Sequence, residues 1–329
     1  MVKTIDLFAG VGGVRIGFER ANFQTVFAND FEPKCKDTYD LNFKDTPLTV
    51  MDVRKINVSD LPKFDFLLAG FPCQAFSIAG YRHGFKDARG NLFFDIARII
   101  DARKPIGFLL ENVKNLYSHD NGKTFRVISE TLDELGYDIK FEILNSMDYG
   151  GVPQNRERIY IVGFRKNTGY IDNFEFPDKI ERQKTILDIL ENPESINQKY
   201  YYNDKPLFER LKEYEFDFGI VYQWRRQYVR QNKSAVCPTL TANMGTGGHN
   251  VPLVRDSRGL RKLTPRECAR LQGFPDSYKL PDISDSHLYK QFGNSVSIPV
   301  IERIAKNIQK VLDREKIITR QPKLSLIQA

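Results

Sequence analysis

Several residue types that many functions depend on are scarce in this chain of 329 residues. It has only four histidines, and none forms an H-x-x-x-H pair, so we expect no zinc site and no other metal. Its four cysteines are scattered without a C-x-x-C pair, which indicates reduced thiols rather than a disulfide framework. No signal-peptide pattern is found, and no apolar run approaches the roughly 18 residues that a membrane-spanning helix needs. We therefore expect a cytoplasmic protein that does not contact a membrane.

The charge balance favours a polyanionic partner. Lys and Arg outnumber Asp and Glu by 49 to 42, which gives a formal net charge of +7 and a sequence pI near 9.0. Such a surplus is typical of proteins that bind nucleic acid, although many other proteins are mildly basic. The length suits about two domains, and the apolar residues, 41% of the total, are enough for a sizeable core.

The first half of the chain alternates short apolar strands with amphipathic helices. This alternation is typical of an α/β fold with a doubly wound, mostly parallel sheet. The expected strands cover residues 4–8, 25–28, 48–50, 64–69, 106–110, 139–144 and 158–164, and the expected helices cover about 13–21, 33–42, 92–102 and 123–135.

The sequence changes character past its midpoint. Residues 177–260 hold few clean helices and indicate a smaller, irregular, strand-rich second domain, in which 242–250 is a loop by composition. A compact helix is expected over 263–271, with Thr264 as its N-cap and a glutamate three residues after the cap. The last expected helix, over 300–312, is amphipathic, and we expect it to pack on the first domain.

A cysteine follows the fourth expected strand, where ligands gather in folds of this kind. In the stretch GFPCQAFS, which begins as the strand ends, Cys73 is a candidate nucleophile. Glu111, after the next strand, is a candidate acid. No histidine base accompanies the cysteine, so protease-like chemistry lacks its base. A carboxylic acid instead suits a substrate that gains a proton on nitrogen as the cysteine adds to carbon, such as a pyrimidine; the alternative is a cysteine that only fills the core.

The first expected strand runs into a glycine-rich loop at 10–13. Asp30 ends the second strand twenty residues after that loop begins, which matches dinucleotide sites whose acid binds ribose hydroxyls. The third glycine of the pattern is replaced by Arg15, so adenosylmethionine, which has no pyrophosphate, fits better than NAD. Asp52, after the third strand, is a candidate partner for an adenine amino group, and Phe31 for stacking on the ring. A tight turn with surface acids is the alternative.

Two stretches rich in arginine are further candidates. Arg156 and Arg158, in the sequence QNRER, suit holding a phosphate or orienting Glu111, or else lie on a solvated strand edge. The stretch 222–233 has four cations, no acid and interleaved aromatic residues, which is the composition of a nucleic-acid-binding face. An exposed basic strand with a half-buried tryptophan is the alternative there.

Taken in order, these residues resemble the motifs of cytosine-C5 DNA methyltransferases, in particular the single-chain bacterial enzymes of restriction-modification systems. The resemblance extends over nearly the whole chain. The matching stretches are DLFAGVGG at 6–13, FPCQAFS at 71–77, ENV at 111–113, QNRER at 154–158, RKLTPRECAR at 261–270 and QFGNSV at 291–296.

The resemblance implies a class I adenosylmethionine-dependent methyltransferase fold in three parts. Residues 1–182 would form the catalytic and adenosylmethionine-binding domain, 183–283 a smaller irregular, β-rich target-recognition domain with its hinge, and 284–329 a return segment that completes the first domain. The implied reaction moves a methyl group from S-adenosylmethionine to C5 of a flipped-out cytosine in a short duplex DNA site, through a bond between Cys73 and C6. S-adenosylhomocysteine is the second product. We expect a monomer, with a companion restriction endonuclease that shares the site without being bound.

The resemblance also implies roles for single residues. Glu111, protonated, would hydrogen-bond N3 of the base, Arg156 would hold its O2 side, and Arg158 would brace the site. The residues expected to hold the cofactor are Phe8, Ala9, Gly10, Val11, Gly13, Asp30, Phe31, Asp52, Val53, Pro72, Leu92, Asn294 and Ser295. The residues expected to contact DNA are Gln74, Ser77, Gln223, Arg225, Arg226, Arg230, Thr241, Asn243, Gly245, Gly247 and Gly248.

Three other functions share some of these features. A DNA-binding regulator without catalysis would tolerate loss of the cysteine, the acid or the arginines, and all are present. A tRNA cytosine methyltransferase shares the catalytic motifs, but the Cys-Phe-Thr signature of such relatives is absent. An NAD-linked oxidoreductase is disfavoured by Arg15 and by the missing catalytic base.

Overall fold

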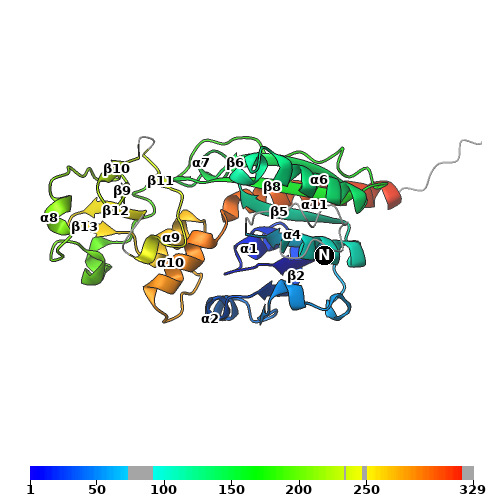
Figure 1. Ribbon diagram of the computed structural model, residues 1–329, viewed down its shortest axis with the longest axis horizontal. Coiled ribbons are helices and arrows are strands. Elements are labelled where there is room, and N and C mark those ends of the chain that lie inside the picture. The colour runs from blue at the N-terminus through cyan, green and yellow to red at the C-terminus, as the bar shows by residue number, and fades with distance from the viewer. Residues whose placement is uncertain (73–91, 233–234, 247–249, 321–329) are drawn as a thin grey trace, which may run out of the picture.

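The computed structural model describes residues 1–72, 92–232, 235–246 and 250–320 (Figure 1). Its main sheet has seven strands in the order β3-β2-β1-β4-β5-β8-β6. All of them run parallel except β8, which is antiparallel to both of its neighbours, so the sheet is mostly parallel and doubly wound, as predicted. The strands are β1 (Val2–Leu7), β2 (Phe23–Asp30), β3 (Leu48–Val50), β4 (Phe66–Gly70), β5 (Gly107–Val113), β6 (Tyr137–Asn145) and β8 (Glu157–Arg165).

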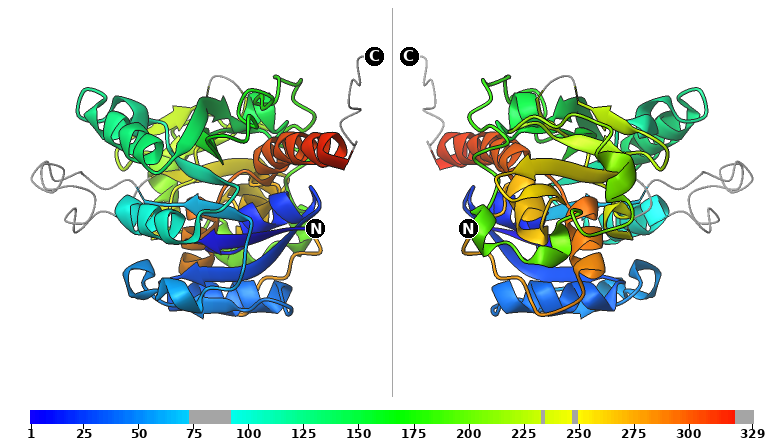
Figure 2. Two further views of the ribbon diagram at one scale, coloured as in Figure 1. Left: turned by 90° about the vertical axis from the view of Figure 1, so that its right-hand side faces the viewer. Right: turned by 90° about the vertical axis from the view of Figure 1, so that its left-hand side faces the viewer.

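Helices cover both faces of this sheet (Figure 2). On one face α1 (Gly13–Glu19) crosses α11 (Ile298–Arg320), and a Cβ on Gly17 would lie 2.5 Å from the side chain of Ile301. On the other face α4 (Leu92–Arg103) and α6 (Lys123–Glu134) enclose a second apolar cluster. The prediction that the last helix packs on the first domain is confirmed, because Val300, Ile304 and their neighbours join the core under β1 and β4.

The second half of the chain forms a smaller sheet at the left of Figure 1. Its strands are antiparallel in the order β10-β9-β12-β13, with bounds β9 (Tyr222–Trp224), β10 (Val229–Gln231), β12 (Val251–Asp256) and β13 (Gly259–Lys262). Trp224 lies in the core of this unit beside the short helix α8 (Phe208–Leu211) rather than half-buried on an exposed strand. The prediction of a smaller, strand-rich second unit is confirmed.

A junction of helices and short strands lies between the two sheets (Figure 1). It contains α9 (Pro265–Leu271), α10 (Asp285–Asn294) and a parallel pair formed by β7 (Gln154–Asn155) and β11 (Cys237–Pro238). Thr264 caps α9 in a reciprocal capping box with Glu267, as predicted. The carboxylate of Glu267 also binds the fully buried guanidinium of Arg261 at 2.8 Å, which fixes α9 against the second sheet.

The remaining elements are short and connect these layers. The helices are α2 (Pro33–Asn42), which flanks β3, α5 (Asn115–Ser118) and α7 (Ser146–Tyr149), and the 3₁₀ turns cover Val53–Lys55, Val58–Asp60, Pro193–Ser195, Gln198–Tyr200 and Met244–Thr246. The last of these turns lies inside the stretch predicted as a loop. None of the helices in the described part of the chain combines the length and the apolar composition of a membrane-spanning segment.

Two differences from the predicted elements affect the site. The carboxylate of Glu111 lies on a strand rather than after its end, because pairing with β8 extends β5 to Val113. The helix α10 was not predicted, and its residues line the pocket at the carboxyl ends of β1 and β2.

Candidate active site

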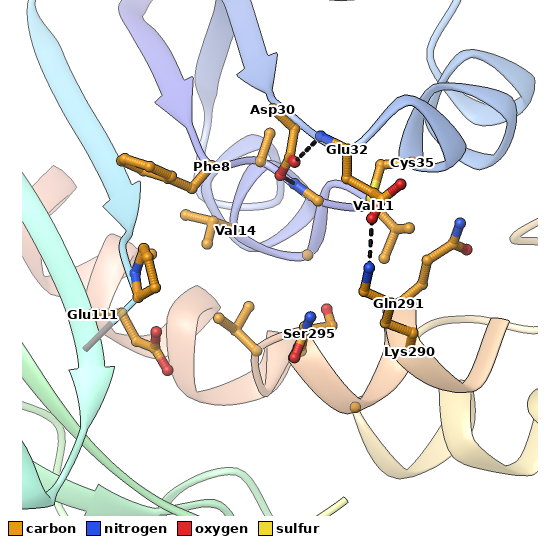
Figure 3. A pocket seen from close by; sticks show the side chains of 18 of the residues that line it. Phe8, Val11, Val14, Asp30, Glu32, Cys35, Glu111, Lys290, Gln291 and Ser295 are labelled. Atoms are coloured by element: carbon orange, nitrogen blue, oxygen red, sulfur yellow. Dashed lines mark hydrogen bonds and ion pairs between the residues drawn. The ribbon is translucent and has the colours of Figure 1, made fainter. Parts of the chain in front are cut away.

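In the described part of the chain, an open pocket of about 1250 Å³, its mouth included, lies where the strand order reverses beside β1. Carboxyl ends of β1, β2, β4 and β5 meet there, as expected for ligand sites in such sheets. Figure 3 shows the glycine loop and Asp30 along one side, Glu111 at one end, and Ser295 and Lys290 of the α10 region along the other side.

Ten of the residues predicted to hold a cofactor line this pocket, and three do not. The lining members are Phe8, Ala9, Gly10, Val11, Gly13, Asp30, Phe31, Pro72, Asn294 and Ser295. Asp52 instead caps the 3₁₀ turn after β3 and pairs with Arg54. Val53 and Leu92 pack in the apolar cluster between β4 and α4.

The glycine loop has the backbone conformation that its sequence favours. Phe8, Gly10 and Gly12 all have positive φ angles, of 57°, 54° and 80°. A Cβ on Gly12 would lie 2.4 Å from the ring of Phe43, so only glycine fits there. Arg15, in place of a third glycine, is buried against Tyr39 and Asp45, and it holds α1 to the rest of the domain.

Asp30, at the end of β2, lines the pocket with a carboxylate that can bind a polar ligand. Asp30 is 8% exposed, and its two oxygens accept hydrogen bonds of 2.9 Å from the backbone N–H groups of Gly10 and Glu32. Burial raises the pKa of this carboxyl, and the two N–H donors oppose the rise. Phe31 is 66% exposed at the rim of the pocket, and Glu32 reaches across to Lys290 of α10 at 2.5 Å (Figure 3).

At the other end, a buried acid faces an arginine. The Nε of Arg158 lies 3.2 Å from Oε1 of Glu111. Burial raises the pKa of Glu111, and the nearby Arg158 and Arg156 guanidinium groups oppose the rise. A carboxyl in this setting keeps its proton to higher pH than an exposed one, and when protonated it can donate a hydrogen bond.

The chain that leads to the predicted nucleophile lies beside this acid. Gly70 pairs in register with Glu111, and the side-chain amide of Asn112 donates to the carbonyl of Phe71 at 2.9 Å. Cys73, Gln74 and Ser77 themselves lie outside the described residues. The described part therefore anchors the residue two places before Cys73 next to the acid motif.

Arg156 is buried beside the pocket, and its hydrogen bonds favour a structural role. We expected it to hold the O2 side of a base, but its two terminal nitrogens donate to the carbonyls of Leu240, Gly293 and Ser295. Burial makes these bonds necessary, because unpaired guanidinium N–H groups and carbonyls would both be costly. Arg158 is the arginine that faces Glu111.

The residues predicted to contact DNA fall into two groups. Arg225, Arg226 and Arg230 belong to the β9–β10 hairpin and its turn, and Gln223 on β9 is buried and accepts from Arg225 at 3.2 Å. Thr241, Asn243 and Gly245 lie in the segment beside α10; Gly247 and Gly248 are outside the described residues. A Cβ on Gly245 would lie 2.5 Å from the ring of Tyr289, so this glycine permits packing on α10.

Several lining residues were missed from the sequence. Asn112, Glu32 and Lys290 belong to the pocket, as do Lys34, Cys35, His287 and Gln291. Asn112 lies within the ENV motif and Gln291 within QFGNSV, so both motifs carried a usable signal. The contact between Glu32 and Lys290 joins residues 258 positions apart, which no local pattern reveals.

Comparison with known proteins agrees with this arrangement. A family model for C-5 cytosine-specific DNA methylase matches residues 2–310. Type II methyltransferase M.Bsp6I of Bacillus sp. (strain RFL6) is 53% identical over 314 residues, which cover 94% of this chain and 99% of that protein. Type II methyltransferase M.HhaI of Haemophilus parahaemolyticus is 42% identical over 323 residues, or 95% of each chain.

Solved structures share the fold at low sequence identity. The methyltransferase EhMeth of Entamoeba histolytica superposes with a TM-score of 0.73 at 19% identity, covering 95% of this chain and 99% of its own. A mutant of Spodoptera frugiperda DNMT2 gives 0.71 at 20% identity, covering 94% and 99%. The extent of the family match and the identity to the Type II enzymes together show that this chain belongs to the C-5 cytosine-specific DNA methylases and is a DNA (cytosine-5)-methyltransferase of the restriction-modification type.

Proposed function

We propose that this methyltransferase uses S-adenosylmethionine, and that it modifies a cytosine rotated out of a short duplex site through a covalent bond to Cys73. One observation carries the proposal. A single pocket joins the glycine loop and Asp30, which suit a nucleoside ligand, to Glu111 and Arg158, which suit a pyrimidine.

The residues at the nucleoside end fit adenosylmethionine. Asp30 is held by two backbone N–H groups in a position to accept from ribose hydroxyls, and the exposed ring of Phe31 offers a stacking surface. Asn294 and Ser295 supply polar atoms from the end of α10. When bound, adenosylmethionine supplies an electrophilic methyl group.

At the other end, the chain's own residues activate the cytosine. The Cys73 thiolate adds to C6 while Glu111, protonated, donates to N3, so the ring becomes an enamine whose C5 is nucleophilic. C5 would take the methyl group as its bond to sulfur breaks, which leaves S-adenosylhomocysteine. Arg158 orients Glu111 and is better placed than Arg156 to meet the O2 side of the base, because it already contacts the acid. A base then removes the C5 proton, and the thiolate leaves as C6 regains its double bond.

The target atom is inaccessible inside a duplex, so the base must leave the stack. Rotating the base out of the stack costs a few kcal/mol. This cost is offset by contacts between the base and the pocket and by protein atoms that fill the gap left in the duplex. Gln74 and Ser77 are proposed to contact the DNA, together with the hairpin arginines and the 239–250 segment. In this proposal residues 1–182 and 284–329 form the catalytic domain, and 183–283 read the site. We further propose a monomer that acts alongside a companion endonuclease without binding it, since separate visits can modify the two strands.

One experiment tests the proposal as a whole. The protein is incubated with S-adenosylmethionine labelled on its methyl group and unmethylated duplex DNA, and the product is sequenced after bisulfite treatment. Label in DNA and protected cytosines within one short motif are expected. Cys73→Ser should retain DNA binding and lose transfer; full transfer by this variant would contradict the covalent route.

A further inference from the structure

Three buried polar side chains join residues 240–246, here called the recognition segment, to the end of α10. Gln154, Arg156 and Gln272 are 0%, 2% and 0% exposed. Gln154 donates to the carbonyl of Leu271 and to the side chain of Gln272, which donates in turn to the carbonyl of Phe292. We call these three residues the junction hub. Nearly every contact they make crosses from one element to another, so they fix how the elements meet.

On one side, the hub holds the backbone of Leu240. Its N–H donates to Oε1 of Gln154 at 3.1 Å, and its carbonyl accepts from Nη1 of Arg156 at 3.0 Å. One residue earlier, the hydroxyl of Thr239 donates to the carbonyl of Asn155 at 2.7 Å. These bonds continue the β7–β11 pairing and set the point from which the recognition segment 240–246 departs.

On the other side, the same guanidinium holds the end of α10. Nη2 of Arg156 lies 2.5 Å from the carbonyl oxygen of Ser295, and both terminal nitrogens lie 3.3–3.4 Å from that of Gly293. The last carbonyls of a helix have no partner within it, and a cation there is favourable. Asn294, between these two carbonyls, lines the cofactor pocket, as does Ser295.

The two segments also touch directly. A Cβ on Gly293 would lie 2.3 Å from the carbonyl carbon and oxygen of Thr241, so only glycine allows the backbones to meet there. Any movement of 293–295 is therefore felt at 240–241 through packing as well as through the guanidinium. Among the described residues, Nε of Arg156 has no hydrogen-bond partner, so the buried cation depends on these three carbonyls.

We propose that Arg156 is a positioning residue that couples occupancy of the cofactor pocket to placement of the recognition segment 240–246. A ligand that contacts Asn294 and Ser295 restricts the carbonyls of Gly293 and Ser295. Because the Arg156 guanidinium binds both of these and the carbonyl of Leu240, it then restricts the position of Leu240 as well. By linkage, DNA that fixes the segment then tightens cofactor binding by the same factor. This inference rests on the proposed function, since it takes the pocket as the adenosylmethionine site and the segment as a DNA contact.

The test measures this coupling rather than turnover. The Kd for a duplex carrying the site mapped by bisulfite sequencing is measured with and without saturating S-adenosylhomocysteine. Wild type is expected to bind the duplex about tenfold tighter with the ligand, within the usual range of coupling factors. Arg156→Lys keeps the charge but cannot reach three carbonyls with a planar fork. The ratio of its two Kd values should therefore fall clearly below that of wild type, although the contact between Gly293 and Thr241 is retained.

Arg158→Lys is the matched control. Arg158 is two residues away and contacts Glu111 rather than the hub, so this variant should lose turnover yet keep the wild-type ratio. If Arg156→Lys does not fold, Thr239→Val replaces it, because that side chain is only half-buried and its loss removes one tether at the same junction; its ratio should also fall.

The possible results distinguish a failure of the proposed function from a failure of the proposed coupling. A wild-type protein that does not methylate the duplex overturns the proposed function. A wild-type protein that methylates but binds DNA equally with and without the ligand overturns the coupling. So does a folded Arg156→Lys, or in its place Thr239→Val, that keeps the wild-type ratio.

Discussion

Glu111 and Arg158 lie on adjacent antiparallel strands with Oε1 and Nε 3.2 Å apart, and their side chains are 11% and 14% exposed. Burial favours the protonated acid, whereas the arginine favours the carboxylate. The pKa of Glu111 is raised on balance, so the acid can still donate a proton or a hydrogen bond. The pair thus combines an available proton with a fixed orientation.

Replacing this acid should affect the chemical step. Glu111→Gln keeps the size of the side chain but removes the carboxyl proton, so methyl transfer should fall about 10²–10⁴-fold. S-adenosylhomocysteine binding, measured by calorimetry, should stay near wild type because the nucleoside end of the pocket is untouched. Turnover equal to wild type would remove the role assigned to Glu111.

The raised pKa of Glu111 also predicts how stability varies with pH. The folded protein holds this proton more tightly than the unfolded chain, so wild type loses stability as pH rises from the unfolded pKa of about 4.3 through the folded value. Glu111→Gln lacks that loss. Urea unfolding of both proteins across this range should show the variant gaining stability relative to wild type as pH rises. A difference that is constant with pH would contradict the burial argument.

Two glycines with nearly the same φ angle separate backbone strain from steric conflict. Gly12 has φ 80° and Gly122 has φ 79°, but an added Cβ would lie 2.4 Å from Phe43 in the first case and 3.7 Å from its nearest neighbour in the second. Gly122→Ala should cost about 1–2 kcal/mol in unfolding free energy. Gly12→Ala should cost more and also weaken S-adenosylhomocysteine binding. Equal costs, with binding unchanged, would show that the glycine loop does not shape the pocket.

The arginines of the β9–β10 hairpin should differ in what they contribute to DNA binding. One terminal nitrogen of Arg225 is held by the side-chain oxygens of Gln223 and Asn250, at 3.2 and 2.8 Å, which orients its guanidinium, whereas Arg230 is exposed. Arg225→Ala should relax discrimination at one G·C pair by about 1–3 kcal/mol. Arg230→Ala should weaken binding to all sequences and lower the salt slope by about 1. Titrations of single-base variants at several salt concentrations distinguish the two, and identical behaviour would reject the assignment.

The sheet could be predicted from the sequence because its strands are buried apolar runs separated by helices. Each predicted strand boundary in the main sheet lies within three residues of the observed one, and the helix Pro33–Asn42 was predicted without error. The second sheet was harder to predict because β9 and β10 have three residues each, too few for a periodic pattern. Helix α10 was missed because Gln291 and Gly293 interrupt its apolar face; both are buried for reasons that lie elsewhere in the chain.

The residues of the site were likewise predictable only in part. Motif residues on strand ends, such as Asp30 and Glu111, could be placed by sequence because the sheet brings strand ends together. The roles of Arg156 and Arg158 could not be separated, since residues two apart share a face of a strand. Arg156 lies in the break between β7 and β8, where contacts with Leu240 and Ser295, more than 80 positions away, decide its role.

The proposed reaction depends on a covalent bond between the Cys73 sulfur and C6 of the base, and this bond can be trapped. The protein is incubated with S-adenosylmethionine and a duplex whose target cytosine carries fluorine at C5, which blocks removal of the C5 proton, and the adduct is mapped by mass spectrometry. Cys35, Cys237 and Cys268 are buried, and burial raises the pKa of each thiol, so they should stay unmodified. One DNA adduct per chain is expected, on the peptide that contains Cys73. A complex with no sulfur–ring bond, or an adduct on another cysteine, would contradict it.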